Sequence, residues 1–226
     1  MNKQSAPYSP SAAGALFPRL LSTWGLVMTL GSAHAATQSY TGVFSHDDDR
    51  TLIAFTLATA ANVTMQTWSF GGGINGAGES IAAGGFAPVL SLFDMNEQLI
   101  GLAQAGAAGC GAGNPDATTG FCWDVVWNGI LDAGSYRAVL TQDGNAPLGS
   151  SLSDGFQQDG QGNYTGPAYL GVAGSFVLVD GSLRVGHWAL DLTTPVPEPE
   201  TWALLLAGLA ILGRTLPRPD STNTTE

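Results

Sequence analysis

The spacing of glycine constrains the fold of this chain more than any other feature. Glycine occurs 31 times in 226 residues, and only short apolar runs lie between the glycine-containing turns. Several of these runs alternate polar and apolar residues, which is typical of strands with one buried face. Residues 36–195 contain no convincing amphipathic helical period. The pattern therefore predicts an all-β fold of short strands joined by many turns.

We expect about eight short strands in this region. Residues 89–93 and 98–102 flank a polar turn and predict a hairpin. The other expected strands are 51–57, 62–68, 123–127, 135–141, 176–179 and 187–192. Because so many strands fall in one stretch of this length, the sequence favours an antiparallel β-sandwich that is jelly-roll-like.

The N-terminal segment has the composition of a secretory signal peptide. Lys3 and Arg19 precede an apolar stretch over residues 20–30. Residues 33–35 then form an Ala-x-Ala pattern, so cleavage is expected after Ala35. We therefore predict that residues 1–35 are a signal peptide with an N-terminal signal helix, and that the folded domain covers residues 36–195.

The C-terminal segment, residues 196–226, combines a rigid motif, an apolar run and a basic residue. Pro197 and Pro199 restrict the backbone to extended conformations. Residues 202–213 are apolar but shorter than the roughly 20 residues of a full bilayer crossing. Arg214 follows and favours a cytoplasmic C-terminal side. This pattern predicts a short hydrophobic helix that engages the inner membrane.

This tail resembles the PEP-CTERM sorting signal of Gram-negative bacteria, which is read by the membrane protease-transpeptidase exosortase. The residues that carry the likeness are Val196, Pro197, Glu198, Pro199 and Arg214. The resemblance implies export, transient inner-membrane anchoring, and processing with exosortase as the partner. It also implies final placement at the cell surface or in the exopolysaccharide matrix, with the exopolysaccharide as a further partner.

A second resemblance concerns the folded region between Tyr40 and Phe156. Residues 88–94 with 99–100, and residues 131–140, are similar to strand elements of bacterial pre-peptidase C-terminal domains. That resemblance implies a β-sandwich and says little about activity.

Acidic residues dominate the charge of the chain, whose formal net charge is −11. Residues 36–195 contain no lysine. Such a surface repels phosphate backbones and anionic lipid, so nucleic acid is excluded as a partner. The acidity suits divalent cations or simple solubility outside the cell, and the second interpretation is favoured.

The densest acidic run follows His46 and leaves two interpretations open. Asp47, Asp48 and Asp49 precede an expected strand, and Asp94 lies on the turn of the expected hairpin. Calcium takes six to eight oxygen ligands from carboxylates and carbonyls, so these four residues are a candidate calcium site. The alternative, a solvated acidic turn, is favoured because no Asp-x-Asp-x-Asp-Gly loop is present. No other cofactor is predicted.

The only two cysteines, Cys110 and Cys122, both fall inside the exported region. An even count in an oxidising compartment predicts a disulfide.

Catalytic motifs are not apparent in this sequence, so we expect a protein that is not an enzyme and assign no catalytic residue. After signal cleavage the histidines are His46 and His187. The tryptophans are candidates either for core filling, which is favoured, or for a sugar-stacking platform. They are Trp68, Trp123, Trp127 and Trp188.

These observations rank three functions. The first is a non-catalytic structural protein of the cell surface or matrix. The second is a calcium-supported glycan-binding module. The third is a secreted hydrolase.

Overall fold

The computed structural model describes residues 35–106, 109–195, 206–209 and 211. The expected signal peptide and the sorting residues Val196, Pro197, Glu198, Pro199 and Arg214 lie outside these ranges, apart from Ala35. Residues 206–209 and 211 are helical. In the described ranges no helix has both the length and the apolar character that a membrane crossing requires.

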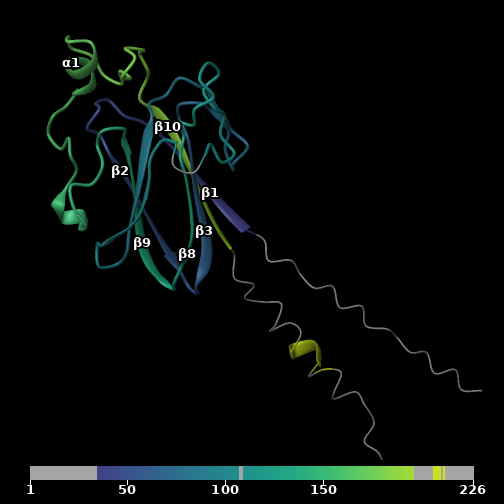
Figure 1. Cartoon of the computed structure of the whole chain (residues 1–226). Helices are drawn as coiled ribbons and strands as arrows, with labels where there is room; N and C mark the ends of the chain where they lie inside the picture. Colours follow the sequence, from purple (N-terminus) through teal and green to yellow (C-terminus); the bar gives the residue numbers. More distant parts are fainter. Residues whose placement is uncertain (1–34, 107–108, 196–205, 210, 212–226) are drawn as a thin grey trace, which may run out of the picture. The chain divides into compact units, whose positions relative to one another are not determined.

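Two four-stranded antiparallel sheets form the described domain (Figure 1). The first, called the β1 sheet, has the order β1 (Ala35–Val43), β10 (His187–Pro195), β3 (Ala61–Trp68) and β8 (Val126–Leu131). The second, called the β2 sheet, has the order β2 (Thr51–Leu57), β9 (Gly134–Gln142), β6 (Pro88–Phe93) and β7 (Leu99–Ala103). The smaller elements are the paired strands β4 (Gly73–Ile74) and β5 (Ser80–Ile81), a 3-10 turn (Leu152–Asp154) and α1 (Thr165–Tyr169). The all-β prediction is confirmed.

The strand pairs are nested within one another along the sequence. The β6–β7 hairpin is innermost, and β3–β8, β2–β9 and β1–β10 enclose it in turn. Successive pairs alternate between the two sheets. The chain therefore runs as one long antiparallel hairpin that crosses from sheet to sheet.

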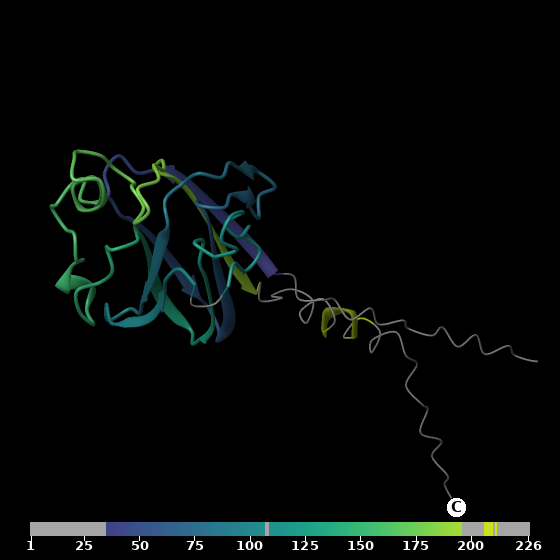
Figure 2. The same cartoon turned by 45° about the horizontal axis from the view of Figure 1, so that its top comes forward.

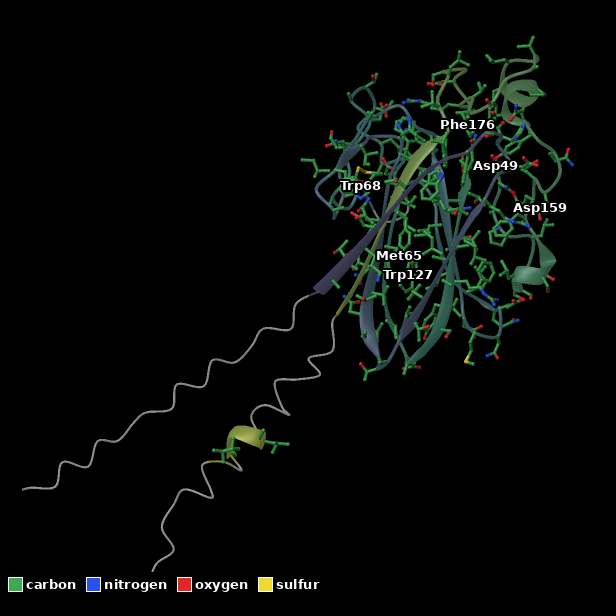
Figure 3. All side chains as sticks on the ribbon, turned by 180° about the vertical axis from the view of Figure 1, so that it is seen from behind. Asp49, Met65, Trp68, Trp127, Asp159 and Phe176 are labelled. Atoms are coloured by element: carbon green, nitrogen blue, oxygen red, sulfur yellow. A yellow bond between two sulfur atoms is a disulfide. The ribbon has the colours of Figure 1, made fainter. Side chains whose placement is uncertain are left out.

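One apolar cluster joins the inner faces of the two sheets. Met65 and Leu190 come from the β1 sheet, while Leu92 and Leu140 come from the β2 sheet, and all four are almost fully buried. Figure 3 labels Met65 among these inward side chains. Burial of apolar surface between two sheets is the main stabilising contribution in a sandwich of this kind.

The outer face of the β2 sheet is also covered. Phe156, in the connection between β9 and β10, packs on Phe93 and Val139. Figures 1 and 2 show this connection, in green, running beside the sheet. Because both faces of β6 are covered, all six of its residues are buried. This explains why residues 88–93 read as an apolar run and not as a strict alternation.

Most of the expected strands are confirmed with small shifts of their ends. Residues 51–57 form β2 as predicted, and residues 62–68, 135–141 and 187–192 lie within β3, β9 and β10. The predicted hairpin is β6–β7. Strand β1 is not among the expected strands, because none of its residues is fully buried and its mostly polar and small side chains carry little apolar signal.

One strand prediction was wrong and another was shifted, because buried aspartates redirect the backbone. Residues 176–179 do not form a strand: Phe176 has a positive φ of 54°, and its N–H donates to Asp47 at 2.5 Å. Strand β8 begins at Val126 and not at Trp123, because Asp124 turns away to accept hydrogen bonds from the backbone after β3.

Candidate functional site

Asp47, the first residue of the acidic run, holds two loops together. Its side chain is completely buried. One carboxylate oxygen accepts from the backbone N–H and the hydroxyl of Thr165, at 2.7 and 2.6 Å, and the other accepts from Phe176. This carboxylate therefore fastens the β9–β10 connection to the β1–β2 loop.

The other acids of the predicted calcium set also accept hydrogen bonds from backbone N–H groups. Asp48 accepts from Gly162 at 2.9 Å, and Asp49 accepts from Ser45 and His46 at 2.6 and 2.9 Å. Asp94 accepts from the N–H groups of its own hairpin turn, at 2.8 and 2.9 Å. Figure 3 labels Asp49, together with Phe176 and Asp159 of the β9–β10 connection.

The structure does not bring the four acids of this set together. Asp47 to Asp49 precede Thr51, which pairs with Leu140, whereas Asp94 follows Phe93, which pairs with Arg137 farther along β9. Within the described residues, no three histidine, cysteine or acidic side chains gather as a metal site would require. Calcium binding at these residues stays a prediction of the sequence.

Two further buried carboxylates are not singled out by the sequence pattern. Asp124 accepts from the N–H groups of Ser69 and Gly71, both at 2.7 Å. Asp191 accepts from the indole of Trp68 at 2.8 Å and from the N–H of Gly76 at 2.7 Å. Both aspartates therefore hold the glycine-rich segment that contains β4. The only signal in the sequence is a single acid inside an otherwise apolar run.

Burial controls the protonation of Asp124. Desolvation raises the pKa of its carboxyl group, although the hydrogen bonds from Gly71, Ser69 and Thr67 oppose this shift. Because Asp124 is only 1% exposed and has no cationic partner in the described salt bridges, its charge is balanced by dipoles alone.

The predicted disulfide between Cys110 and Cys122 is present. Gln66 of β3 anchors its loop: the side-chain amide donates to the carbonyl oxygen of Cys110 at 3.2 Å and accepts from Ala112 at 3.0 Å. Phe121 at the end of the loop packs against Trp123 with ring centroids 4.7 Å apart. The disulfide loop is therefore fixed next to an aromatic cluster.

The two histidines in the described residues lie close to polar groups of loops. His46 lies 3.9 Å from Asp49 on an exposed turn. The imidazole Nε2 of His187 lies 2.8 Å from the carbonyl oxygen of Ala82. Neither contact is the imidazole–carboxylate pairing inside a cleft that would favour a hydrolase.

Among the tryptophans, core filling describes Trp68 and Trp188, which are buried, and Trp127, which packs against the main core. Trp123 differs from them. It is half-buried, stacks on Phe70 at 5.3 Å, and lines a hollow in the surface.

This hollow, called the α1 hollow, lies where α1, the end of β9 and the segment before β8 meet. Its cavity volume is about 30 Å³. The lining side chains are both aromatic and polar. They come from Ala87, Trp123, Gln142, Asp143, Thr165, Tyr169, Val177, Leu178 and Val179.

The polar groups of the α1 hollow are incompletely satisfied. Gln142 is 3% exposed, and its Oε1 has no hydrogen-bond partner in the described residues. Asp143 lies at the exposed rim, where partial desolvation raises the pKa of its carboxyl group. Behind the rim, burial raises the pKa of Tyr164, so its hydroxyl stays protonated and donates to the carbonyl oxygen of Asp143 at 2.6 Å. The hollow thus contains one acceptor, Gln142 Oε1, without a protein donor in the described residues.

A second hollow, of about 260 Å³, lies near the β6–β7 turn. Its polar side chains are already engaged. Arg137 pairs with Glu97, and the hydroxyl of Tyr136 donates to the carbonyl oxygen of Asp132 at 2.9 Å. The α1 hollow is the smaller of the two, and it differs in holding a buried acceptor, Gln142 Oε1, without a donor in the described residues.

No protein-family model matches this chain, and no curated protein matches it either. The function of the chain is therefore inferred from its own residues and geometry.

Proposed function

We propose that this protein is exported, sorted by exosortase through its PEP-CTERM-like tail, and retained as a non-catalytic structural component of the cell surface or exopolysaccharide matrix. The observation that carries the export proposal is the disulfide between Cys110 and Cys122. Thiols in a reducing cytosol stay unpaired, whereas an exported domain keeps such a bond.

The described helical residues support transient anchoring by the tail. Leu206 and Ile211 are 65% and 66% exposed, so apolar side chains are available to lipid. They lie between the Pro-Glu-Pro motif and Arg214, as a membrane-engaging segment requires.

A structural role also fits how the loops are held. Asp47, Asp124 and Asp191 each accept several hydrogen bonds from segments distant in sequence. Buried, satisfied carboxylates of this kind favour one rigid arrangement of the loops. Rigidity suits a protein that must persist outside the cell.

We also infer that the sandwich is a jelly roll. The nested strand pairs support this inference, because successive pairs alternate between two four-stranded sheets. Wrapping one long antiparallel hairpin into two sheets produces this architecture.

Replacing one residue of the motif tests the sorting proposal. In the host, Glu198→Ala should leave a larger, membrane-bound form, because the processing enzyme no longer recognises the motif. Immunoblots of membrane and extracellular fractions measure the outcome. Glu200→Ala, which removes the same charge just outside the motif, is the matched control and should mature normally. Normal maturation of Glu198→Ala would refute the proposal.

A further inference from the structure

We propose that Asn75 is a site of spontaneous deamidation and that the carboxylate of Asp191 controls its rate. In this reaction the backbone nitrogen of Gly76 attacks the side-chain amide carbon of Asn75. The amide group leaves with the Gly76 proton as ammonia, and a cyclic succinimide forms. Water then opens the ring to aspartate or isoaspartate. The reaction does not involve the tail, so this proposal and the sorting proposal fail separately.

The first support is the sequence and the size of this turn. Asn75 and Gly76 lie between β4 and β5. Glycine has no side chain to block the approach of its nitrogen to the preceding residue, so an Asn-Gly pair is well suited to ring closure. Strands β4 and β5 have only two residues each. A small local opening is therefore enough to free the turn.

The second support is the contact that holds the attacking nitrogen. The N–H of Gly76 donates to Asp191 at 2.7 Å. Asp191 is itself fixed in β10, because it also accepts from the indole of Trp68 at 2.8 Å and from the hydroxyl of Ser39 at 2.5 Å. The nitrogen must lose its proton before it attacks, and a carboxylate acceptor stabilises the N–H form. While this contact lasts, the nitrogen is unreactive.

The third support is the position of the amide that would be attacked. Asn75 is only 4% exposed, although residues 76–79 are exposed. Its Oδ1 accepts from the N–H groups of Ala77 and Glu79, at 3.1 and 2.8 Å, and its Nδ2 donates to the carboxylate of Glu79 at 3.0 Å. All these partners belong to the same turn, so they move with it. The contact with Asp191 is what ties the turn to β10.

A second Asn-Gly pair is protected in a different way. Asn128 and Gly129 lie within β8, where they pair with Thr64 and Val63 of β3. The side-chain amide of Asn128 also donates to the hydroxyl of Thr64 at 2.6 Å. Ring closure at this pair requires the β3–β8 ladder to open, which is a larger event than opening of a turn. The rate at Asn128 therefore does not depend on Asp191.

Deamidation would change the charge of the β4–β5 turn. The amide nitrogen of Asn75 that donates to Glu79 is replaced by an oxygen. Two carboxylates then face each other at hydrogen-bonding distance, and like charges repel. We expect the β4–β5 hairpin to open after the reaction.

Ageing of the full chain at mildly alkaline pH, in detergent, tests the proposal. Pepsin digestion at low pH and mass spectrometry then give the extent of deamidation at Asn75 and at Asn128. Asp191→Ala should raise the rate at Asn75 about tenfold or more, because an N–H bond to a charged acceptor is lost. The rate at Asn128 should not change. Asp191→Asn should give a smaller increase, since its amide oxygen still accepts from Gly76.

The rate at Asn128 separates local opening from global unfolding, because an unfolded chain exposes both Asn-Gly pairs. Asp47→Ala is the matched control: it removes another buried carboxylate that has no contact with the β4–β5 turn. It should leave the ratio of the two rates as in the wild type. If Asp191→Ala does not fold, Asp191→Asn provides the same comparison.

Three results would overturn the proposal. The first is an equal acceleration at Asn75 and Asn128 in the Asp191 variants, which would attribute the reaction to global unfolding. The second is an unchanged or slower reaction at Asn75, which would show that the carboxylate does not protect the nitrogen. The third is an equal change in the ratio of the two rates in Asp47→Ala.

Discussion

Buried aspartates organise the loops of this protein one residue at a time. Asp47, Asp124 and Asp191 have almost no exposure, yet none belongs to a described salt bridge. Backbone N–H groups supply most of their hydrogen bonds. Loops rich in glycine lack side chains to pack, so a carboxylate that collects several N–H donors replaces apolar contact as the means of fixing them.

The titration of Asp124 follows from its burial. We expect its carboxyl ¹³C resonance to titrate with a midpoint above the ordinary aspartate value of about 3.9, because desolvation raises its pKa. A raised folded-state pKa contributes stability that is complete below the unfolded pKa. That contribution is lost as the pH rises through the folded pKa. The contribution of Asp124 to stability should therefore decrease from mildly acidic pH upward.

Asp116 provides the internal comparison in the same NMR titration. Its exposed carboxylate accepts hydrogen bonds from the backbone and side chain of Thr119, which lower its pKa. Its midpoint should therefore fall below the ordinary value. If Asp124 titrated at or below Asp116, its carboxylate would be better solvated than its position indicates.

Among the elements, the β9–β10 connection depends most on single contacts. It contains α1 and has few strand-like hydrogen bonds of its own. Phe156 packs it against the β2 sheet, and its Asp159 pairs with Arg50 of the β1–β2 loop at 2.5 Å. Asp47 holds the part that forms one wall of the α1 hollow. The shape of that hollow is therefore set by the β1–β2 loop.

Removing the Asp47 carboxylate should be strongly destabilising. Asp47→Ala leaves the N–H groups of Thr165 and Phe176 buried without acceptors, so we expect a loss of about 3 kcal/mol in the free energy of unfolding. Urea denaturation followed by tryptophan fluorescence measures this loss. Asp49→Ala is the control, because Asp49 accepts only from its own exposed turn, and it should cost about 1 kcal/mol or less. Equal losses of unfolding free energy for the two variants would contradict the role of Asp47 in holding the β9–β10 connection.

At the scale of the whole molecule, the nested strand pairs bring distant parts of the sequence together. Strand β1 pairs with β10, so Tyr40 lies opposite Leu190. Closing such long loops is entropically unfavourable in the unfolded chain. A cross-link that restricts the unfolded chain therefore stabilises the whole fold.

The disulfide between Cys110 and Cys122 is a cross-link that closes a short loop. Replacing both Cys110 and Cys122 with serine should lower the free energy of unfolding by about 3 kcal/mol, from the loop-closure entropy of a short loop. Thermal melting and urea denaturation measure the effect. Reduction of the wild type should give the same loss, and a reductant should have no further effect on the double variant. A wild type that melts identically when reduced would show that the bond contributes nothing.

Strand prediction succeeded where local pattern and tertiary environment agreed. Residues 51–57 alternate and lie at an edge of the β2 sheet, so pattern and strand coincide. Strand prediction failed at residues 176–179. This run is apolar and its composition is typical of a strand, but Asp47, far away in the sequence, holds Phe176 at a positive φ. Local propensity cannot contain that information, because the donor and acceptor are 129 residues apart.

The candidate site was predictable only in part. Trp123 is one of four candidate tryptophans, and the sequence does not distinguish it from Trp68, Trp127 and Trp188. Gln142 and Tyr169 are not singled out, because an isolated glutamine and an isolated tyrosine carry no pattern. Their meeting at one hollow depends on how the β9–β10 connection folds back.

The sequence by itself determined the all-β class, the β6–β7 hairpin and the pairing of Cys110 with Cys122, because turn residues, short apolar runs and an even cysteine count act locally or by elimination. Only the tertiary structure decided which acids are buried, that Asp94 lies apart from Asp47, and that Trp123 lines a hollow with Gln142. Those outcomes depend on contacts between residues far apart in the chain, and such contacts leave no periodic signal in the sequence.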